Sequence, residues 1–220
     1  MIKTIIFDVD GTLLDTERIY MRSWAEGAAD FGYHIPHAAL LETRAVNRSV
    51  AMEVFRRYCG PDFPYMEILE YKKAIIDRLV EETPPDKMRM PHVREVLAQL
   101  RDAGFTLVTA SSSPVKTSRE HLERTGILEF LTDTVGGDMV TRGKPNPDIF
   151  LKAAELAGST PDECFVVGDT PADVLAATAA GMPVFLIPDQ VPANEQTTAL
   201  SRRVLSGLAE LPEAIKEALG

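Results

Sequence analysis

Short runs of apolar residues alternate along the chain with longer segments in which apolar positions recur every three or four residues. Apolar runs that end in small or acidic residues are typical of buried parallel strands, whereas the longer pattern predicts amphipathic helices. The strand-like runs are residues 4–8, 105–111, 164–169 and 183–188, and clear helical examples are residues 93–100 and 149–156. This alternation predicts an α/β fold with a doubly wound, Rossmann-like parallel sheet.

The interval 16–86 departs from this alternation because it holds helical patterns and no convincing strand. Its apolar stripes follow one another at residues 20–31, 50–58 and 68–79. The segment TPPDKMRMP, residues 83–91, contains three prolines and disfavours a continuous helix. We therefore predict a small helical bundle over 16–86, a cap inserted into an α/β core formed by residues 1–15 and 87–220.

Composition and charge limit the function. The 220 residues are 45% hydrophobic and 25% charged, which suits an ordinary globular core. The net charge of −10 argues against a nucleic acid or an anionic membrane as partner, because both need a basic surface. The two cysteines, Cys59 and Cys164, show no metal-ligand spacing, and we expect free thiols in a reducing compartment. With no apolar run long enough for a membrane span, we expect a cytoplasmic protein.

Polar residues stand where predicted strands end. Asp8, Ser111 and Asp169 each take such a position, and Lys144 in the loop sequence GKPNPD adds a cation. Ligands of open α/β sheets bind outside the carboxyl ends of the strands, so these side chains are expected to converge. Carboxylates that share a crevice raise one another's pKa, and a divalent cation relieves this conflict. Carboxylate oxygens suit magnesium. Asp8 could then attack an electrophile while Asp10 moves a proton.

Four stretches together resemble a known family. FDVDGT at residues 7–12, the strand end at Ser111, GKPNPD at 143–148 and GDTPAD at 168–173 resemble, in order, the four motifs of the haloacid dehalogenase superfamily. The helical insertion is similar to the cap of its β-phosphoglucomutase-like branch, so the resemblance covers essentially the whole chain. It implies the same α/β core, a helical cap and phosphoryl-transfer chemistry.

The resemblance implies catalytic and metal-binding roles. Asp8 would be the nucleophile that becomes an aspartyl-phosphate, and Asp10 would be the general acid for the leaving group and then the base for water. Magnesium would be held by Asp8, the main-chain carbonyl of Asp10, and Asp169. Thr170 and Asp173 fit a capping box at a helix start, so we leave Asp173 out of the metal site.

The resemblance also implies a phosphate-binding group. Ser111 would donate to the phosphoryl oxygens, and Lys144 would offset their charge. The backbone amides that follow Ser111, with Ser112 among them, would add donors, because Ser113 and Pro114 are expected to begin a helix whose amino end favours anions. Ser112 and Ser113 also suit ordinary turn and cap positions.

Residues of the cap bear on the choice between phosphatase and mutase. The stretch TRAVNRS, residues 43–49, resembles the loop with which the mutase branch approaches substrate phosphate, and Arg48 falls where that branch has an arginine. A solvent-facing charge at a helix start explains Arg48 equally well. Ala45 replaces a glycine of that loop, which changes its backbone freedom. Tyr20 replaces the mutase's histidine and Thr12 its valine, and both departures favour a phosphatase.

Two further cap residues are candidates for contact with substrate or for cap closure. Thr16 is expected to be the N-cap of the first cap helix and part of a hinge. Lys72 is in helical register with Ile68 and Leu79. We expect its ammonium to reach water from the margin of the bundle. The alternative is that it points across the cleft at the substrate.

The sequence therefore predicts a magnesium-dependent phosphatase that hydrolyses a small phosphorylated metabolite, a sugar or polyol phosphate, through an aspartyl-phosphate. Phosphoryl transfer within a sugar phosphate, as in β-phosphoglucomutase, is the alternative. Asp10 argues against dehalogenation, because the family's dehalogenases have no leaving alcohol to protonate and lack this residue. A phospho-acceptor signalling domain needs neither a proton shuttle nor a cap, and no motif position is degraded as in a silent binding protein.

Overall fold

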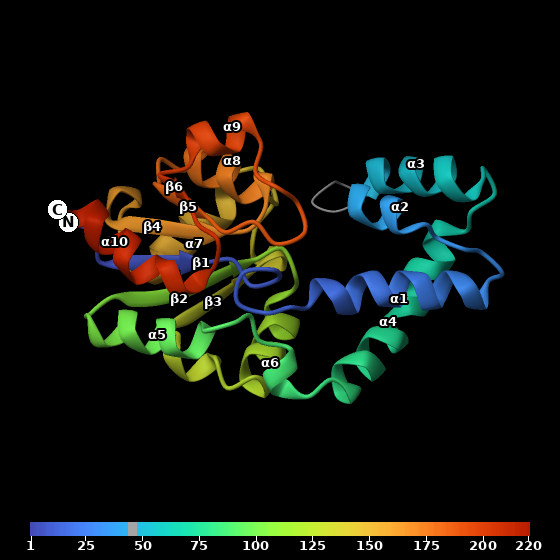
Figure 1. The fold of residues 1–220 in the computed structure, drawn as a ribbon, viewed down its shortest axis with the longest axis horizontal. Coiled ribbons are helices and arrows are strands. Elements are labelled where there is room, and N and C mark those ends of the chain that lie inside the picture. Colours follow the sequence, from blue (N-terminus) through green and yellow to red (C-terminus); the bar gives the residue numbers. More distant parts are fainter. Residues whose placement is uncertain (44–47) are drawn as a thin grey trace. The chain divides into compact units, whose positions relative to one another are not determined.

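A computed structural model describes residues 1–43 and 48–220 of the chain (Figure 1). The chain divides into two compact units, one formed by Met1–Leu14 with Pro85–Gly220 and the other by Asp15–Pro84. These boundaries lie close to the expected division at residues 15/16 and 86/87. Among the described residues, no helix combines the length and the apolar character needed to cross a bilayer.

The larger unit contains a six-stranded sheet in the order β3-β2-β1-β4-β5-β6, in which every neighbouring pair is parallel. Its strands are β1 (Thr4–Phe7), β2 (Thr106–Ser111), β3 (Asp133–Gly136), β4 (Cys164–Gly168), β5 (Val184–Leu186) and β6 (Arg203–Val204). Phe7 pairs with Thr109 of β2 and with Val167 of β4, so the carboxyl ends of these three strands lie side by side. The predicted doubly wound parallel sheet is confirmed.

Helices cover both faces of this sheet (Figure 1). They are α5 (Val93–Asp102), α6 (Val115–Arg124), α7 (Asp148–Leu156), α8 (Pro171–Ala179), α9 (Glu195–Leu200) and α10 (Leu211–Leu219). Single 3-10 turns occupy Pro85–Lys87, Leu128–Phe130, Gly137–Met139, Pro161–Glu163 and Leu208–Glu210. Alternate residues of β1 point to opposite faces. Ile5 and Phe7 therefore join the core beneath α5 and α10, and Ile6 joins the core beneath α7 and α8.

The second unit is helical throughout its described elements. These are α1 (Glu17–Asp30), α2 (His37–Glu42), α3 (Arg48–Cys59) and α4 (Tyr65–Glu82). The three predicted stripes lie on α1, α3 and α4, whereas the six-residue α2 was not predicted. An aromatic cluster fills the interior: Phe55 lies 5.3 Å from Phe63 and 4.7 Å from Trp24 between ring centroids. Such pairs stabilise the unit beyond the area they bury.

Candidate active site

The carboxyl ends of β1, β2 and β4 bring three predicted site residues together. Asp8 follows β1, Ser111 ends β2 and Asp169 follows β4. The amide of Asp8 donates to the carbonyl of Val167 at 2.8 Å, which extends the pairing of β1 and β4 by one residue. Asp8, Ser111 and Asp169 are all buried. The strands that carry them are hydrophobic, so the polar groups of these three residues face one another at the strand ends.

The turn after β1 holds Asp10 and Thr12 beside the strand ends. Leu13 and Leu14 donate their amides to the carbonyl of Val9, which folds the chain back on itself. Gly11 has a φ of +94°, and a Cβ there would lie 2.4 Å from Asp169 Oδ2, so both the turn and the close approach require glycine. Thr12 Oγ1 donates to Asp169 Oδ1 at 3.3 Å, a contact that the sequence reasoning did not foresee.

The carboxylate of Asp10 lies against the loop that follows β2. Its Oδ2 accepts a hydrogen bond from Ser111 Oγ at 3.0 Å and another from Ser113 Oγ at 3.1 Å. Ser111 Oγ in turn accepts from the amide of Ser113 at 3.0 Å. The predicted phosphate-binding serine and the predicted proton carrier therefore share one hydrogen-bonded group.

The start of α6 differs from the expectation. The helix begins at Val115, and Pro114 takes the N-cap position with an extended backbone, so the predicted start at Ser113 and Pro114 was one residue early. The side-chain hydroxyl of Ser113 bonds to Asp10, so it does not cap the helix. The first helical amide, that of Val115, donates to Asp138 Oδ1 at 2.8 Å. Ser112 is exposed at the surface of this loop.

Lys144 links the buried acids. Its Nζ lies 2.5 Å from Asp8 Oδ1 and 2.7 Å from Asp173 Oδ1, and it donates to the carbonyl of Ala110 at 2.9 Å. The ammonium also lies 5.0 Å from the centre of the Phe150 ring. The side chain is only 5% exposed, so this cation is enclosed by the protein and is not a solvated surface charge.

Asp173 joins the acidic group, although the sequence did not lead us to include it in the metal site. The predicted capping box is present: the amide of Thr170 donates to Asp173 Oδ2 at 3.0 Å, and the amide of Asp173 donates to Thr170 Oγ1 at 3.3 Å. Oxygens of Asp8, Asp169 and Asp173 nevertheless all lie within 4.8 Å of one another. The available signal was the place of Asp173 in the first turn of α8, because helical side chains point back toward the helix start.

Burial controls the protonation of this group. Burial raises the pKa of Asp8 to about 8, and the neighbouring carboxylates of Asp173 and Asp10 act in the same direction against the opposing charge of Lys144. Burial disfavours the charged form of Lys144, but Asp173 and Asp8 outweigh it and raise the lysine pKa. The buried group is therefore short of positive charge.

The donor set fits a hard divalent cation. Asp8, Asp169 and Asp173 each offer a carboxylate oxygen within the 4.8 Å group, and all three residues are buried. Magnesium prefers oxygen ligands of this kind and commonly uses one or two carboxylates together with water and substrate phosphate. The missing positive charge and the ligand type thus point to the same class of ion.

The predicted cap residues lie in the second unit. Thr16 is buried and holds the N-cap position of α1 as expected, although its side chain makes no capping hydrogen bond. Arg48 is exposed at the start of α3, while Ala45 and the rest of 44–47 lie outside the described residues.

The expectation that Lys72 reaches water was wrong. The residue is 8% exposed, and its ammonium lies 4.9 Å from the Trp24 ring centre and 5.9 Å from that of Tyr20. Burial lowers the pKa of Lys72 to about 8, against the opposing charge of Glu17. The ammonium lies over both rings, and cation–π contact replaces part of its hydration.

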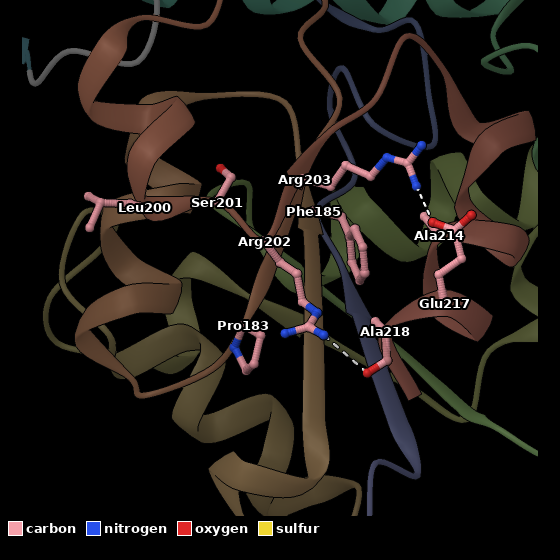
Figure 2. A pocket seen from close by; sticks show the side chains of 9 residues that line it. All are labelled: Pro183, Phe185, Leu200, Ser201, Arg202, Arg203, Ala214, Glu217 and Ala218. Carbon is pink, nitrogen blue, oxygen red and sulfur yellow. Dashed lines mark hydrogen bonds and ion pairs between the residues drawn. The ribbon is translucent and has the colours of Figure 1, made fainter. Parts of the chain in front are cut away.

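A separate hollow of about 480 Å³ lies near β5 and β6 (Figure 2). Pro183, which precedes β5, lines it, so the hollow reaches the amino end of that strand, opposite to the end that carries the acids. Arg202 donates to the carbonyl of Ala218 at 3.1 Å, and Arg203 pairs with Glu217 at 2.5 Å. These contacts connect α10 to the edge of the sheet. None of the residues that line the hollow belongs to the acidic group at the carboxyl ends of the strands.

Comparisons with known proteins agree with this geometry. The family described as haloacid dehalogenase-like hydrolase matches residues 2–181. A phosphorylated carbohydrates phosphatase of Thermotoga maritima is 28% identical over 186 residues, 82% of each chain. A beta-phosphoglucomutase of Bacillus subtilis is 26% identical over 185 residues, 82% of this chain and 80% of that protein. The crystal structure of CbbY from Rhodobacter sphaeroides in complex with phosphate has a TM-score of 0.78 at 27% identity, covering 96% of each chain.

The family match spans most of the chain, and the four motif stretches meet around the carboxyl ends of β1, β2 and β4. The resemblance inferred from the sequence is therefore confirmed. The protein belongs to the haloacid dehalogenase-like hydrolases.

Proposed function

We propose that this hydrolase is a magnesium-dependent phosphatase of a small phosphorylated metabolite, a sugar or polyol phosphate, and that it works through an aspartyl-phosphate on Asp8. The observation that carries the proposal is the buried group in which Lys144 contacts Asp8 and Asp173, with Asp169 beside them. A relative named phosphorylated carbohydrates phosphatase supports the substrate class.

Magnesium would be held by the carboxylates of Asp8 and Asp169 and the main-chain carbonyl of Asp10, with Asp173 as a further buried acid beside them. When bound, the ion would neutralise charge on the acids and on the substrate phosphate, which lets an anion approach a carboxylate nucleophile. Lys144 adds a second positive charge, already fixed next to Asp8. Ser111 and Ser112 would donate hydrogen bonds to the phosphoryl oxygens.

The reaction we propose has two balanced steps. In the first, a carboxylate oxygen of Asp8 forms a bond to phosphorus while the bond from phosphorus to the alcohol oxygen breaks, and Asp10 gives its proton to that oxygen. In the second, Asp10 takes a proton from water, the water oxygen bonds to phosphorus, and the bond to Asp8 breaks to release inorganic phosphate. Asp10 thus ends each cycle protonated, ready for the next alcohol.

We further propose that Asp15–Pro84 acts as a cap that selects the substrate, with Thr16, Arg48 and Lys72 as the candidate residues. A buried lysine over two aromatic rings and an exposed arginine at a helix start are both able to recognise polar groups of a phosphorylated sugar. The free thiols of Cys59 and Cys164 support a reducing compartment, and we place the enzyme in the cytoplasm.

Phosphoryl transfer within a sugar phosphate is the second candidate, and the Bacillus subtilis relative named beta-phosphoglucomutase favours it. Both reactions use the same core residues. Tyr20 and Thr12, which differ from the mutase pattern, support hydrolysis. The two activities are separated by their products, since only the phosphatase releases inorganic phosphate.

A phosphate-release screen tests the proposal. Purified protein is assayed with and without Mg²⁺ on phosphorylated sugars, polyols, nucleotides and glycolytic acids, with a separate assay for isomerised β-glucose phosphate. The Asp8→Asn variant should lose turnover and remain folded by circular dichroism. The matched Asp102→Asn variant, which makes the same change at an exposed position, should keep wild-type activity. Near-normal turnover by Asp8→Asn defeats the proposal, and isomerisation without phosphate release replaces it with the mutase.

A further inference from the structure

We propose that Ser113 is a positioning residue that holds the acid–base carboxylate of Asp10, an inference that rests on the proposed function. Asp10 Oδ2 accepts hydrogen bonds from two hydroxyl groups, Ser111 Oγ at 3.0 Å and Ser113 Oγ at 3.1 Å. Ser111 is the last residue of β2 and Ser113 lies in the loop that follows, so both donors are more than 100 residues from Asp10 in sequence. One serine hydroxyl near a carboxylate would be an ordinary contact, but here two serine hydroxyls donate to the same carboxylate oxygen.

The end of β3 and the residues that follow it pack against the loop that carries Ser113 and hold its backbone by hydrogen bonds. The amide of Gly137 donates to the carbonyl of Ser113 at 2.9 Å, and Asp138 accepts from the amide of Val115. A Cβ on Gly136 would lie 2.1 Å from the Val115 nitrogen, and one on Gly137 would lie 2.4 Å from the carbonyl oxygen of Ser112. The lack of a side chain at Gly136, which ends β3, and at Gly137, which follows it, thus allows this close approach to the loop. The hydroxyl of Ser113 is therefore presented to Asp10 by a fixed backbone.

The two serines cannot do the same work during turnover. A hydroxyl carries a single proton, so it donates one hydrogen bond at a time. When Ser111 donates to a phosphoryl oxygen, as the proposed function requires, it can no longer donate to Asp10. Ser113 can then continue to donate to Asp10 Oδ2 and hold it in place. Its contribution is needed in the substrate complex, at the point where the alcohol oxygen must receive its proton.

The loss of this contact should affect leaving groups unequally. General acid catalysis depends on the carboxyl group lying within hydrogen-bond reach of the departing oxygen. An alkyl oxide is strongly basic and cannot leave without a proton, whereas a nitrophenolate leaves readily without one. A mispositioned Asp10 should therefore slow the cleavage of alkyl phosphates and leave the cleavage of aryl phosphates nearly unchanged. A loss of phosphate binding would slow both.

The test compares kcat/KM, which reports the steps up to departure of the alcohol, for an alkyl phosphate and for p-nitrophenyl phosphate. Ser113→Ala should lower kcat/KM for the alkyl phosphate by about tenfold or more, and by less than about threefold for the aryl phosphate. Ser113→Thr, which keeps the hydroxyl, should recover most of the loss. Ser113→Cys nearly preserves the side-chain volume, but a thiol donates hydrogen bonds only weakly. It should therefore show the same unequal loss of kcat/KM as Ser113→Ala, and it supplies the test if the alanine variant folds poorly.

The control variant is Ser118→Ala, which removes a buried hydroxyl from α6, the helix that follows the Ser113 loop, and it should keep wild-type activity. Equal losses on the two substrates, or no loss on either, overturn the inference. If the wild-type protein releases no phosphate from any substrate, the proposed function fails instead. The inference is then decided by crystal structures of Ser111→Ala and Ser111→Ala/Ser113→Ala: the Asp10 carboxylate should keep its orientation in the first and turn away from the end of β2 in the second, and an unchanged orientation in the second overturns the inference.

Discussion

Lys144 Nζ lies 2.5 Å from Asp8 Oδ1, although 136 residues separate the two in sequence. The same ammonium donates to the carbonyl of Ala110 in β2 and pairs with Asp173 in α8. One side chain therefore connects the end of β1 to the neighbouring strand and to the helix after β4. Because Lys144 contacts both Asp8 and Asp173, we expect the stability of the buried group and its proposed chemistry to depend on this residue.

Replacing Lys144 with methionine should damage both properties. The variant leaves Asp8 and Asp173 buried without the ammonium that pairs with both of them, so we expect a loss of roughly 3 kcal/mol in the free energy of unfolding at pH 7. Without the opposing charge of Lys144, the pKa of Asp8 should rise further above about 8, so the ionised nucleophile becomes rarer still at pH 7 and phosphate release should fall by about 100-fold or more. Urea unfolding and the phosphate assay measure the two effects.

A double-mutant cycle supplies the control for Lys144. Asp173→Asn removes one of the buried negative charges, so the Lys144→Met/Asp173→Asn variant should be less destabilised than the sum of the two single variants. Additive losses would show that the 2.7 Å contact carries no coupling. A Lys144→Met protein as stable as wild type would contradict the whole account of the buried charges.

Magnesium should stabilise the folded protein. A ligand that binds only the native state adds stability as its concentration exceeds its dissociation constant, about 2.7 kcal/mol at one hundred times that constant. We therefore expect the melting temperature to rise with added Mg²⁺ and to fall again with excess chelator. In Asp169→Asn, which removes one of the three clustered carboxylates, the rise should be much smaller. An equal rise in both proteins would place the ion elsewhere.

The central strands and their end residues were predictable because their signals are local. Runs such as residues 4–8 and 164–169 are continuously apolar, as strands buried on both faces must be, and each ends in an aspartate. Parallel pairing then sets the ends side by side, so Asp8, Ser111 and Asp169 could be grouped without coordinates. The strands β3, with the sequence DTVG, and β6, with the sequence RV, gave no such signal, because each contains only one large apolar residue, a valine.

The contacts that were not predicted depend on side-chain direction and on enclosure. The capping box at Thr170 fully explained Asp173 from sequence, yet the same residue uses its second oxygen to pair with Lys144. Ser113 fitted a helix cap, but its hydroxyl bonds to Asp10. Lys72 fitted the margin of a bundle, but it is buried beside the rings of Trp24 and Tyr20. A residue can fit a local sequence pattern, such as a helix cap, and also bind a partner that is distant in sequence. Only the local pattern can be recognised from the sequence.

The stability of the protein should depend on the protonation of Lys72. Burial lowers the pKa of this lysine from 10.5 to about 8 in the folded protein, while the unfolded chain keeps the ordinary value. Between these values the unfolded chain holds a proton that the folded protein has released, so stability rises with pH by up to about 1.4 kcal/mol per unit. Below pH 8 the cost of burying the charge is fully present.

Lys72→Met should therefore be more stable than wild type at pH 7, with the difference shrinking as the pH approaches 10.5. Measuring both proteins by urea unfolding across this range removes the contribution of other titrating groups, because these are common to both. Lys72→Arg keeps the charge throughout and should show no such convergence with Lys72→Met. A stability difference between wild type and Lys72→Met that does not vary with pH would contradict the lowered pKa.

The hydroxyl of Thr134 should cost stability. Thr134 lies in β3 beside Thr109 of β2, is 1% exposed, and its Oγ1 makes no hydrogen bond to the described part of the chain. A buried hydroxyl without a partner destabilises a fold by roughly 1–3 kcal/mol. Thr134→Val has nearly the same shape, so it should raise the free energy of unfolding by about 1 kcal/mol. The matched control is Thr125→Val, because Thr125 Oγ1 donates to the carbonyls of His121 and Leu122. That variant loses a satisfied hydroxyl and should gain nothing, so equal destabilisation of both variants would show that Thr134 has a partner inside the fold.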